Sequence, residues 1–101
     1  MKYGLEENTI GQMVSVFRRH EQIEEVILFG SRAKGNQKLG SDIDLALKGN
    51  GLTLAILNKI TDELDALPMP YTFDICVLTK IENKELVEHI KRVGQNIYKK
   101  N

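Results

Sequence analysis

The sequence predicts an α/β fold, in which a small mixed β-sheet has helices packed on one face. Segments with apolar residues at helical spacing alternate with short strand-like runs along the chain. Two predicted strands are joined by a polar loop, and a third is reached through a helix, which favours a mixed sheet. The pattern leaves the order of the strands open.

Three helices are expected from apolar residues that recur at helical spacing. The first opens at Thr9, which with Gln12 forms a capping box. The second is ended by prolines, and the third follows a capping box of Thr79 and Glu82 and ends at Gly94. The apolar positions are Ile10, Met13, Val14 and Phe17; Leu54, Leu57, Ile60, Leu64 and Leu67; and Leu86, Val87, Ile90 and Val93.

Three strands are expected between these helices. Val26 to Phe29 is a continuous apolar run, typical of a strand buried on both faces. Residues 42–47 alternate, with Ile43, Leu45 and Leu47 on one side and Asp42, Asp44 and Ala46 on the other. Residues 71–78 are rich in strand-forming types. The polar stretch 32–40 is expected to be a helical turn followed by a loop.

Length and composition limit the function. The 101 residues fit a single domain, 1–101. Fourteen basic residues balance fourteen acidic ones, so no general basic field exists to bind nucleic acid or a membrane, and neither is an expected partner. Cys76 is the single cysteine, which excludes an intrachain disulfide and a cysteine-based zinc site. The first residues do not resemble a signal peptide, so a cytoplasmic location is expected.

Three aspartates form the candidate metal site. Asp42 and Asp44 are two residues apart on a predicted strand, so both project from the same face. Asp74 lies between Phe73 and Ile75 inside another strand, against the propensity of aspartate. If the strands are neighbours, three carboxylates converge, a usual ligand set for one or two Mg²⁺ ions. Alternatively, Asp42 is a turn residue and Asp74 faces solvent on an edge strand.

Gly30 and Ser31 form the candidate phosphate site. They lie where the apolar strand ends and a helical turn begins, so their backbone N–H groups would favour phosphate. Gly30 permits close approach of the backbone, and Arg32, Lys34 and Lys38 supply nearby cations. A Gly-Ser pair by itself is more often only a turn. The segment lacks the Gly-Lys-Ser/Thr ending of a P-loop.

The combined motif resembles a known superfamily. Phe29-Gly30-Ser31 followed by Ser41-Asp42-Ile43-Asp44-Leu45 is similar to the signature of the DNA polymerase beta-type nucleotidyltransferases. Gly-Ser-Arg-Ala-Lys-Gly and Ser-Asp-Ile-Asp-Leu-Ala-Leu closely resemble the minimal nucleotidyltransferase (MNT) family, and Asp74 stands where that family has its third carboxylate. The resemblance extends over nearly the whole chain and implies a polymerase beta-like core.

The resemblance also implies a reaction. Gly30, Ser31 and Arg32 would bind the nucleotide, which the resemblance implies is ATP, and Asp42 and Asp44 would hold two Mg²⁺ ions. Asp74 would hold the catalytic ion and help to activate the acceptor hydroxyl. MNT proteins are typically paired with a small helical HEPN-domain protein, often as antitoxin to a HEPN ribonuclease. The implied reaction is transfer of AMP to a hydroxyl of that partner.

Two other functions are compatible with the residues. The chain could be a non-catalytic nucleotide-binding module that neutralises its partner by steric masking. A stand-alone transferase acting on a small molecule is less favoured, because nothing in the sequence encloses a second substrate. A three-stranded sheet with an exposed edge would also permit a homodimer. His20 and His89 are interpreted as surface residues, Cys76 as a buried thiol beside the site, and Lys99-Lys100 as a solvated tail.

Overall fold

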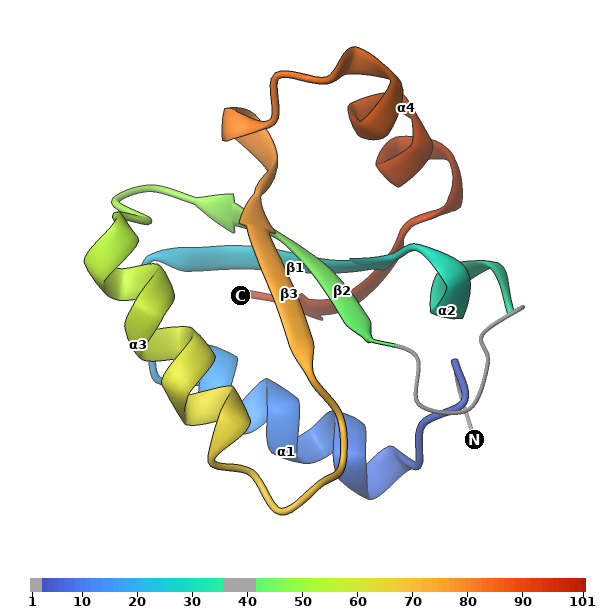
Figure 1. Ribbon diagram of the computed structural model, residues 1–101. Helices are drawn as coiled ribbons and strands as arrows, with labels where there is room; N and C mark the ends of the chain where they lie inside the picture. The colour runs from blue at the N-terminus through green and yellow to red at the C-terminus, as the bar shows by residue number, and fades with distance from the viewer. Residues whose placement is uncertain (1–2, 36–41) are drawn as a thin grey trace.

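The computed structural model describes residues 3–35 and 42–101, and Figure 1 shows their arrangement. Helices and strands alternate as the sequence predicts, with one additional strand near the C-terminus. The elements are α1 (Glu7–Arg18), β1 (Ile23–Phe29), α2 (Ser31–Lys34), β2 (Ile43–Gly49), α3 (Leu54–Asp65), β3 (Phe73–Val77), the 3₁₀ helix η1 (Leu78–Lys80), α4 (Lys84–Val93) and β4 (Gln95–Lys99).

The strands form one mixed sheet in the order β3-β2-β1-β4. β1 is antiparallel to both of its neighbours, whereas β2 and β3 are parallel because α3 connects them. The predicted α/β class with a mixed sheet is therefore confirmed. The expectation of three strands and a solvated tail was wrong, since β4 pairs with β1, with Tyr98 opposite Val26 and Lys99 opposite Glu25.

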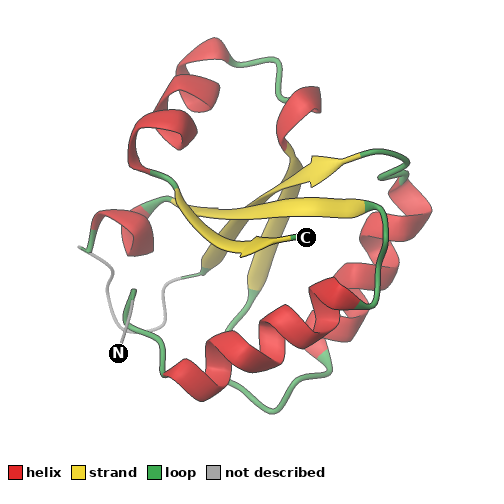
Figure 2. Ribbon diagram, turned by 180° about the vertical axis from the view of Figure 1, so that it is seen from behind, coloured by secondary structure: helices red, strands yellow, loops and turns green. Residues whose placement is uncertain are grey.

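The core lies on one face of the sheet, where α1 and α3 pack side by side (Figures 1 and 2). Val26 and Leu28 of β1 and alternate residues of β2 point into it, as the predicted alternation requires. The buried apolar residues of this cluster are Leu5, Met13, Val16, Phe17, Ile23, Val26, Leu28, Ile43, Leu45, Leu47, Leu52, Ile60, Leu64 and Val77.

The opposite face of the sheet is covered only in part, by α4 (Figure 1). Ile90 of α4 is buried, and the chain then turns directly into β4. A β-carbon at Gly94 would lie 2.5 Å from Cγ2 of Ile27 and would also collide with the carbonyl oxygen of Ile90. Gly94 ends the helix as expected, but its backbone is extended, so glycine serves here for close approach.

Two capping boxes expected from the sequence are not formed. α1 begins at Glu7, so Thr9 lies inside the first turn rather than at the cap. The segment containing Thr79 is a 3₁₀ turn, and α4 is capped instead by Asn83, whose side chain accepts hydrogen bonds from two backbone N–H groups. Asn83 lies nearer than Thr79 to the start of the apolar stripe of α4, whereas α1 starts before its stripe, at a cap residue, Glu6, whose side chain makes no capping hydrogen bond.

His20 was expected at the surface, and the structure shows the opposite. Its side chain is buried at the end of α1, and Nε2 lies 3.2 Å from both carboxylate oxygens of Glu63 on α3. Arg19 Nη1 contacts the same carboxylate at 3.3 Å. The two helices that cover the core are therefore joined by a polar contact as well as by apolar packing.

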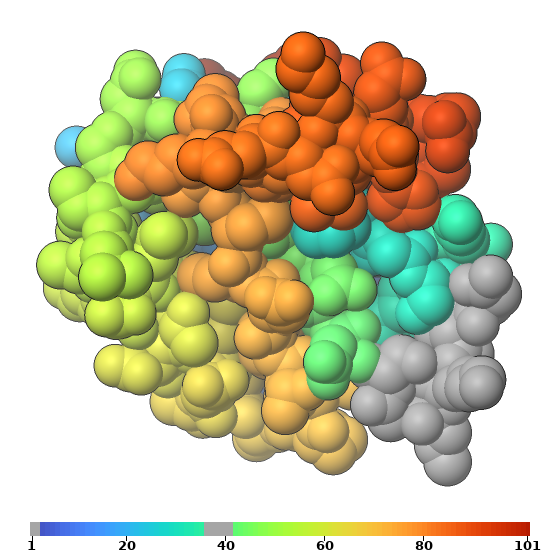
Figure 3. All heavy atoms as spheres, turned by 45° about the horizontal axis from the view of Figure 1, so that its top comes forward, coloured from blue at the N-terminus to red at the C-terminus, as the bar shows by residue number. Residues whose placement is uncertain are grey.

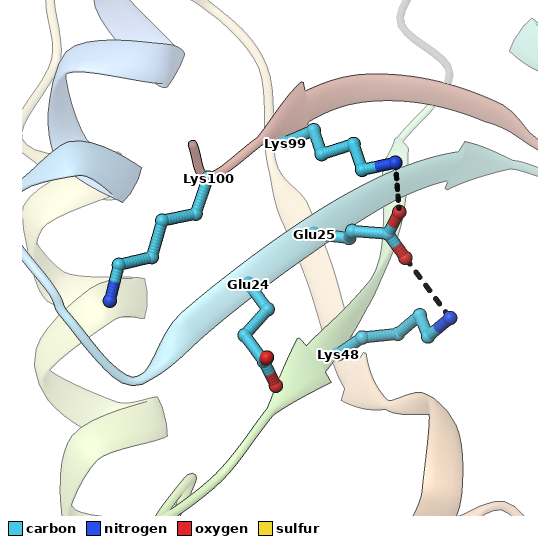
Figure 4. Close-up of a pocket in the computed structure, with 5 residues that line it drawn as sticks. All are labelled: Glu24, Glu25, Lys48, Lys99 and Lys100. Atoms are coloured by element: carbon cyan, nitrogen blue, oxygen red, sulfur yellow. Dashed lines mark ion pairs between the residues drawn. The ribbon is translucent and has the colours of Figure 1, made fainter.

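A charged row crosses the uncovered face at the far end of the sheet (Figure 4). Lys48 Nζ of β2 lies 3.0 Å from one carboxylate oxygen of Glu25, and Lys99 Nζ of β4 lies 3.9 Å from the other. Glu25 thus links three adjacent strands. Lys99, which was predicted to be part of a solvated tail, is held by strand pairing with β1 and by the ion pair with Glu25. None of the helices in residues 3–35 and 42–101 combines the length and apolar character needed to cross a membrane.

The close contact at Gly94 gives the first prediction. Gly94→Ala should lower the free energy of unfolding by about 1–3 kcal/mol, because the added methyl group must displace backbone or Ile27. Gly11→Ala is the matched control, since nothing lies within 4 Å of its added carbon in α1, and it should raise stability by about 0.5–1 kcal/mol. Urea unfolding followed by circular dichroism measures both. Equal effects would show that the close packing at Gly94 is not needed.

Candidate functional site

The candidate site begins where β1 ends. Gly30 has φ +77°, a conformation that L-residues rarely adopt, and it reverses the chain into the single turn α2. Gly35 closes that turn in the left-handed conformation, with φ +80°. The strand, Gly-Ser break and helical turn are those expected from the sequence. Lys38, Gly40 and Ser41 lie outside the described residues.

Strand register brings two of the three aspartates together. Asp44 of β2 pairs with Asp74 of β3 in the parallel ladder, and Phe29 at the end of β1 is opposite Asp44. Ile43 and Leu45, which flank Asp44, are in the core, and Phe73 and Ile75, which flank Asp74, pack against it. Both carboxylates therefore project from the opposite, partly uncovered face. Figure 3 shows the start of β2 reaching the surface beside the α2 turn. The sequence left open whether these two strands are neighbours, and the structure shows that they are.

Asp42 lies at the entrance to β2, on the same side of the chain as Asp44. The Thr72 hydroxyl donates a hydrogen bond to Asp42 Oδ1, and the Thr72 carbonyl accepts one from the Ile43 N–H at 2.9 Å. Thr72 therefore fastens the start of β2 to the start of β3. The sequence reasoning missed this residue, although its spacing of two from Asp74 places it on the same strand face.

The carboxylates influence one another. Partial burial raises the pKa of Asp44 above the usual range of an aspartic acid, and the negative charges of Asp74 and then Asp42 raise it further. Cys76 follows Asp74 on the same face, and its thiol donates to the Leu45 carbonyl at 3.6 Å. Burial, and then the negative charges of Asp74 and Asp44, raise the pKa of Cys76 to about 11. Its thiol is therefore not a nucleophile at neutral pH.

The Gly30 backbone lies directly against one of these carboxylates. A β-carbon built at Gly30 would collide with Oδ2 of Asp44, so any other residue would displace the acid. The Gly-Ser turn and Asp44, which are separated in the sequence by residues 32–43, therefore belong to one site in space. A ligand that contacts the turn is also within reach of the carboxylates.

The side chain of Arg32 does not face solvent, as a side chain that binds phosphate at the surface would. Its side chain is only 3% exposed. Nη1 donates to the Tyr3 carbonyl at 3.0 Å, and the guanidinium lies 4.9 Å from the centroid of the Tyr71 ring. The residue thus joins the N-terminal segment, α2 and the chain before β3. Its expected role in nucleotide binding stays a prediction, whereas Ser31, half-buried beside Gly30, is reachable.

The carboxylate oxygens of the site suit a hard cation, although they do not surround a single point as the ligands of a preformed metal site do. Carboxylate oxygens are the donors that Mg²⁺ prefers, and carboxylates that raise one another's pKa are stabilised by a shared divalent ion. Within residues 3–35 and 42–101, however, no three acidic, histidine or cysteine side chains are grouped as metal ligands. The assignment of Asp42, Asp44 and Asp74 to two Mg²⁺ ions stays a prediction.

Comparison with known families agrees with this geometry. Residues 11–101 match the family described as polymerase beta, nucleotidyltransferase. The chain belongs to this family. The match includes the Gly30 turn, both aspartates of β2 and Asp74, so the superfamily resemblance seen in the motif is confirmed. No curated protein matches this nucleotidyltransferase by sequence.

Solved structures share the fold of this nucleotidyltransferase. A crystal structure described as a toxin–antitoxin with AMP-PNP has 21% identity and TM-score 0.73, with 96% of this chain and 76% of that chain covered. A tri-AMPylated HEPN toxin in complex with MNT antitoxin, from Shewanella oneidensis, has 15% identity and TM-score 0.72, with 95% and 74% covered. A putative nucleotidyltransferase from Sulfolobus solfataricus has 18% identity and TM-score 0.56, with 96% and 92% covered.

The Gly30 contact gives a prediction with a matched control. Gly30→Ala should abolish Mg²⁺-dependent ATP binding, because the new methyl group displaces the Asp44 carboxylate. Gly35→Ala also has a positive φ but meets nothing within 4 Å, so it should cost stability of about 1–2 kcal/mol and leave binding intact. Isothermal titration calorimetry on the folded variants measures this. Normal binding by Gly30→Ala would contradict a shared site.

The raised pKa of Asp44 gives a pH prediction. The neutral acid is favoured by folding, so its contribution is present below the unfolded pKa of about 3.9 and lost as pH rises through the folded pKa. Without added metal, Asp44→Asn should therefore melt at a higher temperature than the wild type at pH 7, and the difference should vanish at low pH. Asp62→Asn, an exposed change on α3, is the control. A pH-independent difference would contradict the cause assigned here.

Proposed function

We propose that this chain is a Mg²⁺-dependent nucleotidyltransferase that transfers AMP from ATP to a hydroxyl of a small helical HEPN-domain protein. In this role it would be the antitoxin of a toxin–antitoxin pair. The observation that carries the proposal is the Asp44–Asp74 pair across β2 and β3, with the Gly30 backbone directly against Asp44. Family membership over residues 11–101 supports the reaction class.

The proposed chemistry is a displacement at phosphorus. The acceptor hydroxyl oxygen forms a bond to the α-phosphorus of ATP, the bond to the bridging oxygen of pyrophosphate breaks, and pyrophosphate leaves. Bound Mg²⁺ supplies the positive charge that stabilises the attacking and leaving oxygens. Asp74 is exposed beside Asp44 and would accept the hydroxyl proton. Gly30 and Ser31 would hold the phosphates, and Asp42 and Asp44 would hold the metal.

The partner is proposed from the relatives that share the fold. Structures containing an AMPylated HEPN toxin with an MNT antitoxin, and a toxin–antitoxin with AMP-PNP, align with nearly all of this chain. Asp42 and Asp74 are exposed and Asp44 is half-buried, so an acceptor as large as a protein can reach the carboxylates from the surface. The adenine nucleotide and the HEPN acceptor are therefore the first to test.

A second candidate function is favoured by one observation. The described residues do not contain three grouped metal-ligand side chains. A non-catalytic module would need the nucleotide site only for regulation and would neutralise its partner by covering it. The two functions differ in whether the carboxylates are required for neutralisation or only for nucleotide binding.

The deciding experiment incubates the purified chain with α-³²P-labelled ATP, Mg²⁺ and a co-expressed HEPN-domain partner. Label should appear on the partner. The Asp42→Asn/Asp44→Asn variant should lower the labelling rate at least about a hundredfold, because without these carboxylates no Mg²⁺ would be held to stabilise the charge that develops at the reacting phosphate. Asp62→Asn, an acid-to-amide change remote from the site, should label normally.

The same variants separate the two functions. If the double variant still forms the complex but no longer neutralises the partner, transfer is the mechanism. Full neutralisation by the double variant, with no label transferred by the wild type, would replace the transferase by the binding module.

A further inference from the structure

A second recognition site lies on the same side of the sheet as the carboxylates. It is a groove of about 400 Å³ between the end of β2, η1 and α4, within the size range of ligand-binding pockets. Three half-buried apolar side chains, one hydroxyl and two lysines line it, and none of the six is acidic: Leu78, Ile81 and Val87, Thr79, and Lys48 and Lys91.

The two lysines are held in different ways. Val87 and Lys91 are four residues apart on α4, so both face the groove from one side of the helix. Lys48 enters from β2, and Glu25 holds its Nζ at 3.0 Å (Figure 4). Glu25 offsets part of the Lys48 charge, so Lys91, which is exposed, is the main cation of the groove.

The groove and the carboxylate pair are in register along one strand. Asp44 and Lys48 are four positions apart on β2, so their side chains project from the same face, about 13 Å apart along the strand. An extended peptide covers that distance in about four residues. Ala46 lies between them on the same face and is fully buried, so an acceptor segment that reaches both Asp44 and the groove must pass around this covered part of the strand and needs more than four residues.

We infer that this groove docks an acidic–apolar segment of the acceptor protein, more than four residues from the hydroxyl that receives the nucleotide. The apolar floor takes an aliphatic or aromatic side chain, and Lys91 and Lys48 pair with carboxylates beside it. The evidence for a binding groove is the set of residues that line it and their charge. The identity of its ligand as the acceptor protein rests on the proposed transfer reaction.

The groove is tested without catalysis by methyl NMR of the full chain. The probe is the peptide acetyl-Glu-Leu-Asp-Leu-Glu-amide, and its counterpart with lysine at every acidic position is the control. The acidic peptide should shift the methyl signals of Leu78, Ile81 and Val87, and Lys91→Glu should weaken binding about fivefold, as reversal of one exposed charge does. Lys84→Glu, the same change elsewhere on α4, should not.

Three results would overturn the inference. The acidic peptide at millimolar concentration could leave the groove methyls unchanged, or the basic peptide could shift them equally. Concentration-dependent shifts without peptide would show that a second copy of the chain occupies the groove instead.

The link to the acceptor is tested in the transfer assay. Lys91→Glu should raise the KM for the acceptor protein about fivefold with kcat and ATP binding unchanged, since the groove touches neither nucleotide nor reacting atoms. An unchanged KM would remove the link and leave the groove as a separate site. Absence of transfer by the wild type would instead reject the proposed function, while the NMR result would stand.

Discussion

The parallel pairing of β2 with β3 is the constraint on which the site depends. It places Asp44 beside Asp74 with no freedom to separate by more than a side-chain rotation, so mutual repulsion is built into the backbone. Apolar neighbours on the same strands point into the core under α1 and α3, which fixes the register, because a slip of one residue would bury the acids. Burial on one face thus enforces charge crowding on the other.

Around this pair, the other features of the site serve to hold strand ends in place. Thr72 connects the start of β3 to Asp42, and the buried Arg32 fastens the α2 turn to Tyr3 and Tyr71. Gly30 then brings backbone into contact with Asp44.

Sequence periodicity predicted the core elements well because burial on one face leaves a clear pattern. The alternation through β2 and the helical stripes identified many residues of the core, but Leu54 is 72% exposed and the buried Val16 was not among the expected positions. Periodicity alone did not place the Gly-Ser turn beside the aspartates. β4 was missed because Gln95–Lys99 is mostly polar and is recruited by pairing with β1 rather than by its own hydrophobicity. His20 was wrongly predicted to be at the surface because its partner, Glu63, is far away in the sequence, on α3, and a local sequence pattern does not indicate such a contact.

The position of β1 between β2 and β4 also bears on how the chain folds. One partner strand follows closely in sequence, but the other comes from the far end, so a long loop must close before β1 is paired on both sides. Until then the apolar run Val26–Phe29 carries an open edge that can nucleate aggregation. Glu24 and Glu25 immediately precede that run and act as gatekeepers, since their charges repel a second copy of the same unpaired strand.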